Sequence, residues 1–325
     1  LVLLTAVSFP WHERASSVGI VLLVFHWLWD RDLIFKIRRL ALTPEWWLCW
    51  AFFFYHIVAW LWSPHRAEGW HSVEVKLSFL VLPLLFGTEN HLNADRRPIL
   101  EWSFVVSCAV SFVYCMVQSW LAHPQAGYSV IFQRMNISEP LMHPGYYSNY
   151  LAFAVVLLSL GLWENRRRPT GEQWPAFLLI GFLLFALFTL ISKTAVLYLL
   201  FFALFMLWRL TAAMAKPLVR YGVYLSVVLL LLLSFFLMPS VNRRYQEAAK
   251  ETKAVAAKDL LIPNSTGTRL AAWDLEWQLI AERPVLGYGT GSANPLLLDL
   301  LQKNGYVHLV KHRLHTHNQV LHTWI

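Results

Sequence analysis

Five histidines lie close together near the end of the chain, where a new apolar run begins. They are His308, His312, His315, His317 and His322. A neutral imidazole is the side chain best suited to accept a proton near pH 7, so this cluster is a candidate source of a general base. Zinc is less well served, because no cysteine lies nearby and the pattern His-Glu-x-x-His is absent from the sequence. We therefore expect no metal site. The alternative for each histidine is a polar residue at a membrane interface.

Three cations stand where an anionic ligand could be bound. Lys193 lies at the tip between two apolar runs, Lys76 lies about one turn into another run, and Arg269 opens an amphipathic helix. Charges inside or beside membrane spans are costly and are functional candidates by default. The guanidinium group can bind phosphate with paired donors, and a helix N-terminus favours the same anion. The alternatives are lysines that snorkel to the interface and an arginine bound to lipid headgroups.

A second histidine site precedes another apolar run. His143 is followed by Pro144 and Gly145, and Arg134 lies shortly before it. Two interpretations remain open for this segment: His143 and Arg134 line the same cavity as the cations, or they form a structural turn.

The elements that must position these residues are membrane-spanning helices. Of the 325 residues, 57% are hydrophobic and 14% charged, and the mean hydropathy is +0.46. The apolar residues form several runs of about 17–25, the length that crosses a bilayer as a helix. The composition excludes a cytosolic enzyme, a secreted disulfide scaffold and a disordered chain. We expect an all-α, polytopic transmembrane bundle with about nine to ten spans. The expected spans are 1–10, 16–29, 46–62, 72–87, 99–121, 146–163, 174–191, 194–208 and 218–238, with another opening after Thr316.

Lysine and arginine alternate between the loops in a way that predicts orientation. One set of loops holds twelve of these residues and the intervening set holds three. The lysine- and arginine-rich loops are expected in the cytoplasm. The second set contains Arg66, Arg134 and Lys193 and faces the periplasm in a Gram-negative cell. This bias also explains the net charge of +8 without nucleic acid as a partner.

One long segment interrupts the apolar pattern on the periplasmic side. We expect a membrane bundle over 1–238, a periplasmic helical loop over 239–314, and over 315–325 the start of a further transmembrane helix that is cut short. The first residue is not methionine, so we also expect truncation at the start. Within the loop, Asn242–Asp259 reads as a polar helix. Leu270, Trp273, Trp277 and Ile280 recur at helical spacing and predict an amphipathic helix with an aromatic face on the membrane. The glycine-rich turn Gly287–Gly291 lacks the spacing of a nucleotide-binding loop.

Four segments of the sequence together resemble motifs of one family. They are Ser265–Trp273 (STGTRLAAW), Glu282–Gly291 (ERPVLGYGTG), His315–Gln319 (HTHNQ) and Ser192–Ala195 (SKTA). They are similar to motifs of the O-antigen ligase and O-antigen polymerase superfamily. The resemblance implies a GT-C-like, all-helical membrane glycosyltransferase in the bacterial inner membrane, with its active site facing the periplasm. Such an enzyme takes a glycan linked to undecaprenyl pyrophosphate and transfers it to an acceptor, without a cofactor, a metal or a nucleotide sugar.

The resemblance also implies roles for individual residues. His317, before Asn318, matches the family's general base, and Arg269 matches the loop arginine that binds the donor pyrophosphate. Lys193 stands where the family more often has arginine, which keeps the charge but loses the paired donors. Lys76 corresponds to an early lysine of the family. Supporting positions are His315, Asn318, His143 and Arg134.

Three enzyme activities are possible within this class, and they differ in the acceptor of the glycan. A ligase uses lipid A–core oligosaccharide, which we favour, a polymerase uses a second lipid-linked repeat, and a protein O-oligosaccharyltransferase uses serine or threonine. A transporter or flippase of lipid-linked sugars is the alternative from another class. It predicts polar residues toward both membrane faces and inverted repeats, and the sequence shows neither pattern.

Overall fold

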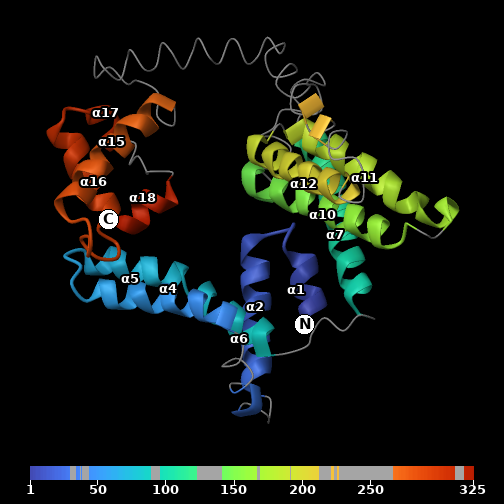
Figure 1. The fold of residues 1–325 in the computed structure, drawn as a ribbon, viewed down its shortest axis with the longest axis horizontal. Coiled ribbons are helices and arrows are strands. Elements are labelled where there is room, and N and C mark those ends of the chain that lie inside the picture. The colour runs from blue at the N-terminus through green and yellow to red at the C-terminus, as the bar shows by residue number, and fades with distance from the viewer. Residues whose placement is uncertain are drawn as a thin grey trace. The chain divides into compact units, whose positions relative to one another are not determined.

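Every regular element in the described part of the chain is an α-helix (Figure 1). The computed structural model describes residues 1–29, 34–36, 38, 44–88, 96–122, 141–166, 169–190, 192–211, 221–222, 225–226, 266–311 and 318–325. The helices belong to two compact units. The first unit comprises Leu1–Lys36 and Glu89–Pro217, and the second comprises Ile37–Thr88 and Leu218–Ile325.

The first unit is built around one central helix. Its helices are α1 (Val2–Ser8), α2 (Glu13–Leu28), α7 (Arg97–Ala122), α10 (Pro144–Glu164), α11 (Thr170–Leu190) and α12 (Lys193–Thr211). Helix α10 packs against α7, α11 and α12, while α1 packs against α2 and α7. His143 begins α10 because its Nδ1 accepts the Gly145 N–H at 3.1 Å, and Pro144 has the fixed φ that suits a first helical residue.

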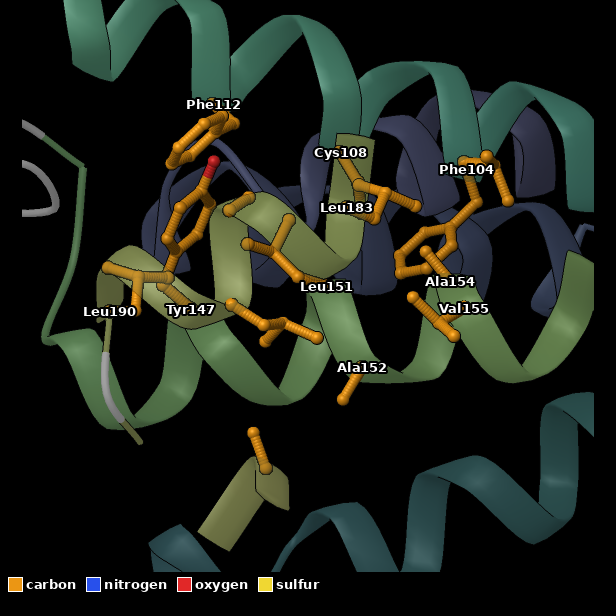
Figure 2. Packing of buried hydrophobic residues seen from close by; sticks show 14 of the residues in the cluster. Phe104, Cys108, Phe112, Tyr147, Leu151, Ala152, Ala154, Val155, Leu183 and Leu190 are labelled. Atoms are coloured by element: carbon orange, nitrogen blue, oxygen red, sulfur yellow. The ribbon is translucent and has the colours of Figure 1, made fainter. Parts of the chain in front are cut away.

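The core of this unit lies between α7, α10 and α11 (Figure 2). Its largest fully buried side chain is Tyr147, which lies beside Phe112 and whose hydroxyl is 2.9 Å from Ser111 Oγ. A buried tyrosine hydroxyl needs such a partner, because burial removes it from water. Cys108 and Cys115 are free thiols with no exposed area, as expected for packing residues.

A polar contact fastens the first helix to α7. Trp11 Nε1 donates to Ser107 Oγ at 2.9 Å, and Ser107 Oγ donates to the backbone carbonyl of Val7 at 2.6 Å. Ser107 is only 5% exposed, so its hydroxyl satisfies two groups in an apolar setting. This pair of bonds fixes how the segment after α1 meets α7.

The second unit joins segments that are far apart in the sequence. Its helices are α4 (Pro44–Trp60), α5 (Arg66–Val75), α6 (Ser78–Thr88), α15 (Thr266–Glu282), α16 (Ala293–Lys303), α17 (Val307–Lys311) and α18 (Gln319–Trp324). Helices α5 and α6 turn back along α4, with Trp60 Nε1 donating to the Arg66 carbonyl at 2.9 Å across the turn. Helix α16 packs against α15, α17 and α18 (Figure 1).

Length and composition identify membrane spans in both units. Five helical segments are long and apolar enough to cross a bilayer: Arg66–Thr88, Arg97–Ala122, Pro144–Glu164, Gly171–Leu190 and Thr194–Thr211. Arg14–Leu28 and Trp46–Trp60 are shorter apolar helices. Large apolar side chains on these helices remain exposed, including Phe188 at 81%, which suits contact with lipid rather than water. The prediction of an all-helical polytopic membrane protein is therefore confirmed. The expected span 218–238 and the polar helix Asn242–Asp259 lie largely or wholly outside the described residues.

Helix α15 packs on protein through one face and leaves part of the predicted membrane-facing stripe exposed. Leu270 and Trp277 are 43% and 52% exposed, although Ile280 is buried and Trp273 packs partly against its neighbours. The face buried against protein is formed by Ala271, Ala272, Leu275, Leu279 and Ile280. Two adjacent alanines allow α16 to approach closely, so small residues rather than aromatic ones mark the side that packs on protein.

Candidate functional site

Helix α15 carries the exposed side chain of Arg269 in its first turn. The opposite side of the helix is held by two clusters, one with Leu297, Leu301 and Leu309 and one with Ala293, Leu321 and Ile325. Arg269 is exposed and lies three residues after Thr266, where the helix begins. Its guanidinium and the positive end of the helix dipole are both suited to an anion.

The turn Gly287–Gly291 lies against α4 and α5. Gly289 and Gly291 have φ values of +93° and +92°, which favour glycine. A Cβ atom at Gly289 would lie 2.6 Å from the Ala59 carbonyl oxygen, and one at Gly291 would lie 2.2 Å from the Gly69 nitrogen. The glycines are therefore required both for the backbone conformation and for the close approach to the helical hairpin. These structural requirements explain the glycines without a phosphate-binding loop.

Thr290, at the centre of this turn, bonds to α4. Its hydroxyl donates to the His56 backbone carbonyl at 2.8 Å, and its Oγ1 lies 3.1 Å from His56 Nδ1. The Thr290 backbone N–H points to the Ala59 carbonyl at 3.4 Å. Both Thr290 and His56 are buried. The turn thus fixes the position of the His56 side chain within an apolar helix.

Lys76 lies at a break between α5 and α6. Around it the backbone changes to i→i−3 bonds, with Lys76 N bonding to Val73 O and Leu77 N to Glu74 O, both at 3.0 Å. We expected Lys76 one turn into its span, but α5 begins at Arg66, so Lys76 lies near the middle of Arg66–Thr88. The polar first half of this segment is helical, although its composition did not indicate a span. Lys76 Nζ donates to the Ser72 carbonyl at 3.3 Å.

These elements enclose a small pocket within the second unit. Its polar lining comes from His56, Ser72, Lys76, Thr290, His322 and Thr323. Tyr55, Ala59, Leu286, Gly289, Gly291, Ala293 and Ile325 complete the wall. The cavity volume is about 20 Å³, which is room for a single water molecule. A cation and two imidazoles therefore line one confined space, which has room for a single small polar group.

Helix α18 connects the pocket to the predicted base. Asn318 caps it, since its Oδ1 accepts the N–H groups of Val320 at 3.1 Å and Leu321 at 3.3 Å. His322 follows one turn later and lines the pocket. His317 immediately precedes the cap but, like His315, lies outside the described residues. Asn318, the residue directly after His317, therefore has a structural role as the N-cap of α18.

A second polar contact lies beside the turn. Tyr288 donates its hydroxyl hydrogen to the Glu282 carboxylate, and the Arg283 guanidinium lies 4.5 Å from the centre of the Tyr288 ring. Burial raises the pKa of Tyr288, and its bond to Glu282 acts in the same direction. The tyrosine therefore stays neutral at physiological pH and holds the turn to the end of α15.

The other predicted residues fall elsewhere. Lys193 begins α12 in the first unit, where the neighbouring hydroxyls of Ser192 and Thr194 lie 3.0 Å apart. His143, also in the first unit, caps α10, which favours the structural turn over the ligand site. Arg134 lies outside the described residues. Of the predicted cations, the pocket thus contains Lys76, while Arg269 does not line it. Among the described residues, no three histidine, cysteine, aspartate or glutamate side chains are grouped to hold a metal ion.

His56 was not among the predicted site residues. A signal was available, because a histidine inside an apolar run is a functional candidate by the rule applied to Lys76. Its pairing with Thr290 was not readable, since 234 residues separate them.

Helix content, membrane-length segments and a polar pocket define a multi-pass helical membrane protein. Comparison with known proteins adds the family. Residues 178–325 match the family described as O-Antigen ligase. The matched range contains Lys193, Arg269, His317 and the glycine turn, and it ends with α18. No curated protein and no solved structure matches the chain.

Proposed function

We propose that this protein is an O-antigen ligase-type glycosyltransferase. It transfers a glycan from undecaprenyl pyrophosphate to lipid A–core oligosaccharide, at the periplasmic face of the bacterial inner membrane. The observation that carries the proposal is the family match over residues 178–325, because it includes the motifs of Arg269 and His317. The pocket in the second unit supports this proposal. It is lined by Lys76 together with His322 and the glycine turn, which both lie in the matched region.

In the proposed reaction, His317 acts as general base. It takes the proton from an acceptor sugar hydroxyl as that oxygen bonds to the anomeric carbon of the donor. The bond from the anomeric carbon to the pyrophosphate oxygen breaks, and undecaprenyl pyrophosphate leaves with the electron pair. Direct displacement inverts the anomeric centre. Arg269, Lys193 and Lys76 stabilise the negative charge on the leaving group, which is greater in the transition state than in the donor. This assignment requires no metal ion.

Transfer by the purified full-length protein in detergent tests this function. The donor is a glycan on undecaprenyl pyrophosphate, offered with lipid A–core, with a second lipid-linked repeat, or with a serine-containing peptide. We expect transfer to lipid A–core. Transfer only to the second repeat would identify a polymerase, and transfer to the peptide a protein O-oligosaccharyltransferase.

His317→Ala tests the general base. We expect it to reduce transfer at least about 100-fold, the range of general acid–base catalysis. His308→Ala is the matched control, because His308 belongs to the same histidine cluster but is exposed on α17. Unchanged transfer by His317→Ala, with the protein still folded, would remove His317 from the mechanism.

A further inference from the structure

His56 is a buried polar residue in the apolar helix α4. It is 4% exposed, and its ring lies 4.7 Å from the Phe52 ring and 5.6 Å from the Tyr55 ring, measured between centres. Burial of an imidazole among aromatic residues in a membrane helix is costly unless both ring nitrogens are bonded. The partners of the two nitrogens therefore show what His56 is for.

The Thr290 hydroxyl fixes the tautomer of His56. A threonine hydroxyl has one hydrogen, and Thr290 donates it to the His56 carbonyl at 2.8 Å. The contact of 3.1 Å between Nδ1 and Oγ1 must then be donated by the histidine. The proton of the neutral ring is consequently on Nδ1, and Nε2 carries a free lone pair that can only accept.

The buried Nε2 atom has no hydrogen-bond partner among the described residues, and His56 lines the same cavity as Lys76. An unbonded buried acceptor is rare in folded proteins, because it loses its hydrogen bond to water. It needs a hydrogen-bond donor, which excludes phosphate oxygens but suits a hydroxyl group. The space of about 20 Å³ fits one hydroxyl in place of one water.

We propose that His56 is a substrate-binding residue whose Nε2 accepts a hydrogen bond from a hydroxyl of the donor sugar next to the pyrophosphate held by Lys76. The inference rests on the proposed function, since it takes the ligand to be a sugar linked to a prenyl pyrophosphate. Lys76 provides the contact to the anion, and His56 distinguishes a sugar-bearing lipid from the bare pyrophosphate that remains after transfer. The pair thereby favours donor over product.

Two substitutions separate the nitrogens of His56. His56→Asn places an amide N–H near the position of Nδ1 and keeps the bond to Thr290, but it removes the acceptor in the pocket. His56→Gln places an amide oxygen near the position of Nε2 and keeps that acceptor. The probes are undecaprenyl pyrophosphate with and without one sugar, bound to the full-length protein in detergent. We expect His56→Asn to weaken binding of the sugar-bearing probe about three- to tenfold, the range of one hydrogen bond, and to leave the bare pyrophosphate unchanged. His56→Gln should retain most of the affinity, and Lys76→Ala should weaken both probes.

The outcomes distinguish the two proposals. Equal weakening of both probes by His56→Asn, or weakening of neither, would overturn the role of His56 while leaving the proposed function intact. Binding of neither probe by the unsubstituted protein would overturn both. A measurement that does not depend on a folded variant uses probes that each lack one sugar hydroxyl. One of them should bind the unsubstituted protein three- to tenfold more weakly, and a series that binds uniformly would contradict the assignment.

Discussion

Ser63 and Ser292 meet through their hydroxyl groups, with the two oxygens 3.0 Å apart. Ser63 follows α4 and Ser292 precedes α16, and they are 3% and 0% exposed. Ser292 donates its hydrogen to the Tyr288 carbonyl at 3.1 Å, so Ser63 is the donor between the serines. This bond joins the helical hairpin of α4 and α5 to the glycine turn Gly287–Gly291.

Removal of either serine should destabilise the protein. We expect Ser63→Ala and Ser292→Ala each to lower the free energy of unfolding by about 1–2 kcal/mol, because each removes the buried hydrogen bond between the two hydroxyl groups. The double substitution should cost less than the sum, by roughly 1 kcal/mol. Unfolding of all four proteins in detergent measures this coupling. Strict additivity would show that the two hydroxyls do not interact.

Gly289→Ala should be more harmful than Gly305→Ala. Both glycines have positive φ, at +93° and +82°, so both substitutions introduce similar backbone strain of about 1–2 kcal/mol. A Cβ atom at Gly289 would also lie 2.6 Å from the Ala59 carbonyl oxygen, whereas nothing lies within 4 Å at Gly305. Thermal unfolding should show a clearly larger decrease for Gly289→Ala. Equal decreases would mean that the close approach of the turn to α4 has no energetic role.

Ser107→Ala should weaken the attachment of the first helix. It leaves Trp11 Nε1 without its acceptor at 2.9 Å, which should cost about 1–3 kcal/mol. Ser159→Ala is the control, because the Ser159 hydroxyl donates to the Val155 carbonyl of its own helix, α10. Chemical unfolding monitored by tryptophan fluorescence compares the two. A control that loses as much stability as Ser107→Ala would refute the bridging role.

Arg269→Lys tests whether paired donors matter at the N-terminus of α15. The substitution keeps the charge but loses the planar fork, so we expect about a tenfold decrease in transfer, with a larger loss for Arg269→Ala. Lys303→Ala serves as a charge control, because Lys303 is exposed and paired with Asp299 at 2.6 Å on α16. Its transfer rate should stay within about twofold of the original. Full activity of Arg269→Lys would reduce Arg269 to a simple positive charge.

Apolar runs predict the membrane helices well, because each must satisfy its backbone within itself and expose side chains to lipid. The start of the helical segment that contains Lys76 was not predicted. This segment begins at Arg66, in a polar stretch where hydropathy gives no signal, whereas the expected span began at residue 72. The existence of a helix was thus more predictable than the residue at which it begins.

The pocket was only partly predictable. Local spacing identified Lys76 and the histidine cluster as candidates, but the partner of His56 depends on which distant segments pack together. The face of α15 shows the same limit. Leu270 and Trp277 fit an apolar pattern equally well whether they contact protein or lipid, and only the packing of Ala271 and Ala272 against α16 decides between them.

The bond between His56 and Thr290 spans 234 residues, which has a consequence for biosynthesis. During translation, α4 and α5 enter the bilayer long before the glycine turn has been made. The imidazole must therefore spend that interval without its threonine partner, and the second unit cannot close until the ribosome has passed residue 290. Assembly of this unit is a late event with a large loop-closure cost, so shortening the chain before α16 should leave the hairpin inserted but unassembled.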